Sequence, residues 1–254
     1  MRKAHMPTAQ RLELLFHHLK AARYASISEL CGLLNVSEST VKRDLALLEK
    51  RVKLERTHGG VVLLGHSVYG GRFAASMEVN KEQKQRIAQA AAALIADEDI
   101  VYIDSGTTCL LLYQAMRAQG VTVFTNSIPV LLEEPHSGTQ LFGLEGQFDR
   151  ELMCVTGPLC IENLGRILPQ KLFMSPQGLS ADLYLLDERN NTTARKLMQV
   201  AGTRVVMMDS SKIKAYYMFK VAPLTNVDVF ITDDGAPDDM LRDIERAVGK
   251  LIVV

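Results

Sequence analysis

The sequence lacks the features that mark secreted, membrane-spanning and zinc-binding proteins. No apolar run approaches the ~20 residues of a membrane-spanning helix, and no apolar stretch precedes a cleavage site near the N-terminus. The four cysteines, at positions 31, 109, 154 and 160, form no Cys-x-x-Cys pair. We therefore expect buried free thiols, no metal, no cofactor and a cytoplasmic protein that does not associate with a membrane.

The chain also has no net charge, but the balance differs between its two parts. Residues 1–60 contain 11 Lys and Arg against 6 Asp and Glu, whereas the remainder contains 18 against 23. A cationic head on an anionic body is typical of a DNA-binding module joined to a second domain, because phosphate contacts need lysine and arginine. The length of 254 residues and the hydrophobic content of 47% allow two domains with ordinary cores.

Two short helices are predicted to follow one another near the N-terminus. Ser26 and Glu29 have the spacing of a capping box, and the helix that they start is expected to end at Asn35. In the next helix, Val41 and Leu45 belong to one apolar stripe. That stripe alone also fits an ordinary surface helix. The two helices together are more informative. A helix-turn-helix consists of a short helix, a tight turn and a second helix with a polar N-terminal face, and this segment has all three.

The second of these helices is predicted to be a DNA-recognition helix capped by Ser37. Its hydroxyl and charged side chains can meet base edges and phosphates in a major groove. Two strands joined by glycines within residues 52–63 predict a wing, although an ordinary hairpin has the same pattern. The candidate DNA-binding residues are Ser37, Glu38, Ser39, Thr40, Lys42, Arg43, Arg56, Thr57, His58, Gly59 and Gly60.

After a glycine-rich stretch, apolar runs alternate with helical segments. A helix is expected from Asn80, whose side chain can cap it. Strands are expected at residues 100–103, 121–124, 140–144, 171–174, 204–208, 229–232 and 251–254. Continuous apolar strands separated by helices indicate a mostly parallel sheet covered on both faces. The predicted fold class is therefore α/β, with a small winged helix-turn-helix domain at residues 1–63, a linker at 64–79 and a larger α/β domain at 80–254.

Polar residues follow three of these strands at their carboxyl ends, where open α/β sheets place ligands. The Ser-Gly-Thr-Thr run at 105–108 has the hydroxyls and the helix N-terminus that cradle a phosphate, although a plain helix cap has the same sequence. Residues 125–127 offer groups suited to a sugar, and the cluster at 209–212 offers an acceptor and a cation. The candidate ligand-binding residues are Asp104, Ser105, Gly106, Thr107, Thr108, Thr125, Asn126, Ser127, Asp209 and Lys212.

These motifs resemble the DeoR family of bacterial transcriptional regulators. The resemblance lies in residues 37–49 and 56–60 at the N-terminus and in residues 104–108, 125–127 and 209–212 further on. It implies a winged helix-turn-helix fused to a sensor domain similar to ribose-5-phosphate isomerase, which binds a phosphorylated sugar or a related metabolite. It also implies a homo-oligomer on a double-stranded DNA operator, since a small winged domain gains affinity by pairing across two half-sites.

Three positions depart from the pattern of that family. Ser76 stands where the family often has arginine, Glu145-Gly146 stands where it has a glycine pair, and residues 181–193 lack its glycine-threonine element. An acidic side chain at position 145 would repel a phosphate. Either the side chain points elsewhere or the ligand is less anionic.

Two functions are compatible with these observations. The first is a transcriptional regulator, expected to repress a carbohydrate-metabolism operon under the control of the bound metabolite. The second is an isomerase-type enzyme with a regulatory DNA-binding head, for which Asp104 and Asp209 are candidate bases. The acidic loop and the glycine-rich lysine loop of such isomerases are not found in the sequence, which favours the regulator and no enzymatic activity.

Overall fold

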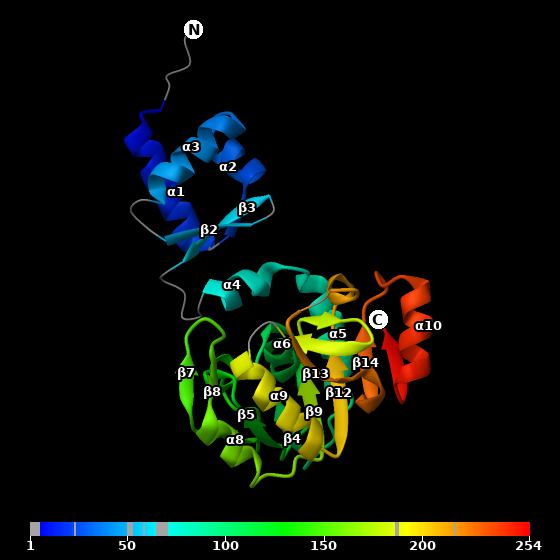
Figure 1. Ribbon diagram of the computed structural model, residues 1–254. Coiled ribbons are helices and arrows are strands. Elements are labelled where there is room, and N and C mark those ends of the chain that lie inside the picture. Colours follow the sequence, from blue (N-terminus) through cyan, green and yellow to red (C-terminus); the bar gives the residue numbers. More distant parts are fainter. Residues whose placement is uncertain are drawn as a thin grey trace. The chain divides into compact units, whose positions relative to one another are not determined.

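The computed structural model describes residues 6–22, 24–49, 53–57, 59–64, 71–185, 188–215 and 217–254. The chain divides into two compact units, Met1–Val79 and Asn80–Val254 (Figure 1). His58 and most of the glycine-rich stretch expected as a linker lie outside the described residues. Within the described ranges, no helix has both the length and the apolar character needed to cross a membrane.

The first unit packs three helices against a small antiparallel sheet. Its helices are α1 (Thr8–Ala22), α2 (Ile27–Leu34) and α3 (Glu38–Leu48), and its sheet has the order β1 (Tyr24–Ser26), β3 (Gly60–Leu64), β2 (Lys53–Thr57). Helix α2 starts with a complete capping box between Ser26 and Glu29, and it ends at Asn35 in the left-handed region. The predicted winged helix-turn-helix fold is confirmed.

A buried ion pair fixes α3 on α1. Arg11 Nε lies 2.6 Å from Asp44 Oδ2, and Arg11 Nη2 lies 3.0 Å from Asp44 Oδ1. Arg11 and Asp44 are 6% and 1% exposed. Removing either partner would leave a buried charge uncompensated, so the pair favours one orientation of α3.

One local expectation in the first unit is wrong, and a helix lies in the segment expected as a linker. Ser37 precedes α3, but its side chain accepts no hydrogen bond from the helix backbone, because its hydroxyl pairs with those of Ser39 and Thr40 at 3.0 Å each. The expected linker contains a helix, α4 (Gly71–Glu78), in which Phe73 is buried. Its short apolar stripe follows a glycine-rich run, which obscured the helical spacing in the sequence.

The second unit is built around a seven-stranded sheet in which every neighbouring pair is parallel. The strand order is β15 (Lys250–Val253), β14 (Val229–Thr232), β12 (Thr203–Met207), β9 (Lys171–Met174), β4 (Ile100–Ile103), β5 (Thr122–Thr125), β6 (Gln140–Gly143). Successive side chains of β4, Val101, Tyr102 and Ile103, are all fully buried. Both faces of the sheet are therefore covered, and the predicted parallel sheet is confirmed.

Helices and two smaller β structures cover the sheet. The helices are α5 (Lys81–Ala92), α6 (Thr107–Ala115), α7 (Ile128–Leu131), α8 (Pro158–Leu164), α9 (Glu188–Val200) and α10 (Asp238–Ala247). A hairpin of β7 (Gln147–Asp149) and β8 (Cys154–Thr156) and an antiparallel sheet of β10 (Gly178–Leu179), β11 (Asp182–Leu185) and β13 (Phe219–Pro223) complete the fold, with short 3-10 turns η1 (Ser210–Lys212) and η2 (Leu224–Asn226). Helix α5 packs on α6, and α8 packs on α9 (Figure 1).

Candidate functional site

The first candidate surface is the outer face of α3. The inner stripe of this helix, with Val41 and Leu45, is buried in the core of the unit as expected. The predicted DNA-binding residues on the outer face are exposed, except for Thr40, which is partly exposed: Ser37, Glu38, Ser39, Lys42 and Arg43. Hydroxyl and charged groups are therefore available together at the N-terminal half of one helix.

Lys42 and Arg56 are already paired with carboxylates of the same unit. Lys42 Nζ lies 2.6 Å from Glu38 Oε1, one helical turn earlier. Arg56 of β2 makes two contacts with Glu49, of 2.7 and 3.1 Å, and these hydrogen bonds raise the pKa of Arg56. Among the ion pairs of the described residues, none involves Arg43. Exposed pairs of this kind contribute little to stability, so DNA phosphates can replace the carboxylates at small cost.

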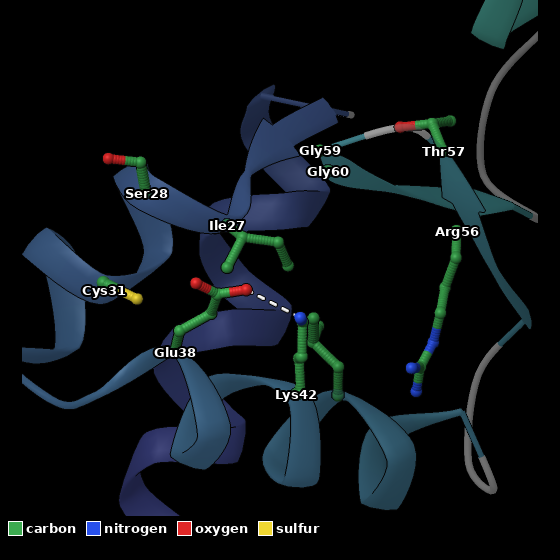
Figure 2. Close-up of a pocket in the computed structure, with 10 residues that line it drawn as sticks. Ile27, Ser28, Cys31, Glu38, Lys42, Arg56, Thr57, Gly59 and Gly60 are labelled. Carbon is green, nitrogen blue, oxygen red and sulfur yellow. Dashed lines mark ion pairs between the residues drawn. The ribbon is translucent and has the colours of Figure 1, made fainter.

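A groove of about 730 Å³ lies between α2, α3 and the wing (Figure 2). Figure 2 shows Glu38 and Lys42 side by side on α3 and Arg56 extending from β2. The lining residues are Ile27, Ser28, Cys31, Glu38, Lys42, Leu45, Arg56, Thr57, Gly59 and Gly60. At Gly60 an added Cβ would lie 2.5 Å from the ring of Tyr24, so this glycine leaves room for that ring, while Gly59, with a φ of 86°, supplies the turn.

The second candidate site lies at the carboxyl ends of the parallel strands. From β4 the sheet grows one way through β5 and β6, and the other way through β9, β12 and β14, so the strand order reverses between β4 and β9. A crevice for a ligand forms at such a reversal. There Ser175 after β9 lies near Thr108 of α6, with 3.5 Å between their hydroxyl oxygens. Gly106, with a φ of 126°, supplies the turn into α6.

Two lysines meet beside this reversal. Lys84 of α5 is only 2% exposed. Lys212 donates to Ser175 Oγ at 3.1 Å and to the carbonyl oxygen of Pro176 at 3.2 Å. Burial, and then the charge of Lys212, lower the pKa of Lys84 to about 8, and burial also lowers the pKa of Lys212. A buried cation beside a partly buried one favours an anionic ligand.

Asp209 is held by donors of the protein itself. Its Oδ1 accepts from Asn80 Nδ2 at 2.9 Å and from the hydroxyl of Ser211, and its Oδ2 lies 3.9 Å from Lys212 Nζ. Burial opposes ionisation, but Lys212, Ser211 and Asn80 together keep the pKa of Asp209 below its ordinary value. Asn80, expected to cap α5, makes no cap hydrogen bond and is turned toward Asp209 instead.

Thr125 and Ser127 are used by the backbone around them. The hydroxyl of Thr125 donates to the carbonyl oxygen of Ile103 at 2.6 Å and accepts from the N–H of Ser127 at 3.0 Å. Ser127 Oγ accepts from the N–H of Val130 at 3.5 Å and caps α7. Both hydroxyls therefore shape the strand end, and their role in ligand binding stays a prediction.

The remaining predicted residues at the strand ends are buried. Asp104, Ser105, Thr107, Thr108 and Asn126 are between 0% and 8% exposed. Burial raises the pKa of Asp104 from 3.8 to about 7. Glu145, which stands where the family has a glycine, is exposed. At the next residue, Gly146, an added Cβ would lie 2.6 Å from the carbonyl oxygen of Thr156.

Sequence reasoning missed Lys84, Asn80 and Asn190 as members of this site. Lys84 had a visible signal, because it occupies the buried stripe of α5 at the spacing of Ile87 and Ala88. Asn190 of α9 donates to Ser105 Oγ at 3.4 Å across 85 positions of sequence, and no local pattern marks it.

Comparison with known proteins identifies two domains in the chain. A DeoR-like helix-turn-helix domain matches residues 11–66, and a DeoR C terminal sensor domain matches residues 79–234. The HTH-type transcriptional repressor GlcR of Bacillus subtilis is 29% identical over 226 residues, which cover 88% of each chain. The HTH-type transcriptional regulator UlaR of Shigella sonnei is 28% identical over 247 residues, which cover 94% of this chain and 96% of the relative.

Among solved structures, ribose 5-phosphate isomerase A of Methanocaldococcus jannaschii is similar over 53% of this chain, with a TM-score of 0.38 and 16% identity. The match spans about half of that isomerase, 55% of its chain. A similarity of this size carries no functional argument.

Proposed function

Because the chain belongs to the DeoR family of helix-turn-helix transcriptional regulators with a C-terminal sensor domain, we propose that it is a cytoplasmic repressor of a carbohydrate-metabolism operon. A phosphorylated sugar or a related metabolite bound at the carboxyl ends of the parallel strands controls its affinity for the operator. The placement of two cations at this strand-order reversal, Lys84 buried and Lys212 partly buried, is the observation that carries this proposal. Two lysines at a strand-order reversal are suited to hold a phosphate.

The DNA-binding half of the proposal rests on α3. Ser39, Thr40 and Arg43 point away from the core at the start of this helix, where a recognition helix contacts base edges. The chain acts as a homo-oligomer in this proposal, because two copies of one winged domain can contact two half-sites and so reach the affinity of a specific complex.

The alternative of an isomerase with a DNA-binding head is less well supported. Asp209, one of the two candidate bases, accepts hydrogen bonds from Asn80 and Ser211 and pairs with Lys212, which keep its pKa low and make it a weak base. Asp104 remains as a second candidate. Turnover of pentose or hexose phosphates by the purified protein would favour the enzyme instead.

The test measures operator binding by the full chain. A gel shift with the DNA upstream of its own gene cluster is titrated in the presence and absence of hexose and pentose phosphates. We expect one phosphate ester to change the affinity, and we expect Lys212→Ala to bind the same DNA without responding to that ester. Lys250→Ala, at an exposed position of β15, is the matched control. An operator affinity unchanged by all phosphorylated sugars, but changed by an unphosphorylated one, would overturn the proposed ligand class.

A further inference from the structure

Three oxygen acceptors at the strand ends have no hydrogen-bond donor among the described residues. They are Oδ1 of Asp104 after β4, Oδ1 of Asn126 after β5 and Oδ1 of Asn190 in α9. Asp104 and Asn126 are 4% and 0% exposed, and Asn190 is partly buried. Buried oxygens of this kind are nearly always hydrogen-bonded in folded proteins, so three at one site call for donors from a ligand.

A hydrogen bond brings two of these acceptors together. Asn190 Nδ2 donates to Ser105 Oγ at 3.4 Å, and Ser105 directly follows Asp104 in the chain. The amide of Asn190 is therefore fixed through its nitrogen, while its oxygen is left for another partner. Helix α9 contributes this acceptor from a segment that carries no family-like motif.

The third acceptor is fixed through strand β8. Asn126 Nδ2 donates to the carbonyl oxygen of Val155 at 3.3 Å, and the N–H of Val155 donates to the carbonyl oxygen of Asn126 at 2.8 Å. Cys154 lies next to Val155, and its pKa is raised to about 12 by burial and then by the negative charge of Asp104. Strands β4 and β5 pair in parallel with Ile103 opposite Thr125, so Asp104 and Asn126, which follow these residues, are neighbours at the strand ends.

The cluster is also close to the lysines. Lys212 donates to Ser175 Oγ at 3.1 Å, and Ser175 Oγ lies 3.5 Å from Thr108 Oγ1 in α6. The thiol of Cys109, the next residue of α6, and the N–H of Asp104 both donate to the carbonyl oxygen of Phe173, at 3.9 and 2.9 Å. One small molecule can therefore contact the acceptors at one end and the cations at the other.

We propose that Asp104, Asn126 and Asn190 form a hydroxyl subsite that selects effectors with several O–H donors, and that Asn190 is a specificity-determining residue. This inference rests on the proposed function, because it divides the effector into a phosphate held by lysines and a polyhydroxy chain held by acceptors. A carboxylate in place of the hydroxyls would bring an acceptor and a negative charge against Asp104. The effector class is therefore a polyol or sugar phosphate and excludes sugar acids.

The test is calorimetric titration of the full chain with three probes: sorbitol 6-phosphate, sorbitol and n-hexyl phosphate. The first carries both groups, and each of the others carries one. We expect sorbitol 6-phosphate to bind at least about tenfold more tightly than hexyl phosphate, because its hydroxyls satisfy the buried acceptors. Asn190→Ala should weaken sorbitol 6-phosphate about tenfold and leave hexyl phosphate unchanged, which also shows that the variant is folded. Gln199→Ala removes an amide side chain at an exposed position of the same helix; it is the matched control and should change neither.

The outcomes separate the two proposals. Equal affinity of hexyl phosphate and sorbitol 6-phosphate, or an equal loss for both in Asn190→Ala, would overturn the hydroxyl subsite and leave the proposed function intact. Binding of sorbitol as tight as that of its phosphate, still dependent on Asn190, would support the subsite and overturn the phosphate in the proposed function. No binding by any probe would contradict both.

Discussion

The two units of this protein build their functional surfaces in opposite ways. The candidate DNA interface uses one helix and one hairpin, and its ion pairs join residues four positions apart, Glu38 with Lys42, or seven apart, Glu49 with Arg56. The strand-end site instead joins Asn80 to Asp209 across 129 positions of sequence. Most side chains of the first surface are exposed, and most of those in the second are buried.

This difference sets the kind of response that each surface should give to a substitution. Exposed charges are screened by water and salt, so changes on α3 should be modest and dependent on ionic strength. Buried charges have shifted pKa values, so changes at the strand ends should be large and dependent on pH. Four predictions test this contrast.

The largest effect is expected from Asp104→Asn on stability. Burial raises the pKa of Asp104 from 3.8 to about 7, so between these values the folded protein holds a proton that the unfolded chain has released. Stability therefore falls as pH rises through this window, and above pH 7 the charged side chain lowers stability by as much as ~4 kcal/mol. Asp104→Asn should raise the free energy of unfolding by more at pH 8 than at pH 4, as measured by urea titration at both values.

Lys84→Met should follow in size. Loss of a buried cation that contacts a phosphate should weaken effector binding by about 10- to 100-fold, because charge-assisted hydrogen bonds are the strong ones. In the wild type, affinity should also fall as pH rises through about 8, since Lys84 then loses its charge. Calorimetry of both proteins with the responding phosphate ester measures this. Lys250→Met serves as the control, and an equal loss in that variant would argue against a specific contact.

Arg43→Ala should have a smaller effect on operator binding. The slope of log affinity against log salt is negative, and the loss of one phosphate contact makes it shallower by about one. Between 0.1 M and 1 M salt, the affinity of the variant therefore falls about tenfold less than that of the wild type. Lys42→Ala should change the slope less, because Glu38 already neutralises Lys42 in the free protein. Anisotropy titrations over a salt series measure both slopes. Identical slopes for the two variants would show that the Glu38–Lys42 pair does not persist.

The smallest effect is expected from Glu38→Gln. The substitution frees Lys42 without removing it, so affinity for random DNA should rise about twofold, the range of one exposed helical ion pair. The slope against salt should become steeper at the same time. A fall in non-specific affinity would mean that Glu38 contacts DNA favourably rather than restraining Lys42.

Much of the fold could be predicted because its signals are local. The capping box at Ser26 and Glu29, the left-handed stop at Asn35 and the apolar runs of the parallel strands each depend on residues close in sequence. The cap prediction at Asn80 was wrong for the opposite reason, whereas the one at Ser37 was wrong although its partners, Ser39 and Thr40, are local. Each side chain has a choice of partners, and Asn80 found a distant one in Asp209.

The candidate site could be predicted only in part. The sequence by itself determined which strands end in polar residues, because a strand is recognised from consecutive residues and its polar residues follow directly in the chain. The tertiary structure decided which of those polar groups remain free for a ligand. It assigned Thr125 and Ser127 to the backbone and brought Asn190 and Lys84 to the site. Hydrogen-bond satisfaction and burial depend on neighbours from distant elements, and these are in place only after the sheet and its helices have packed.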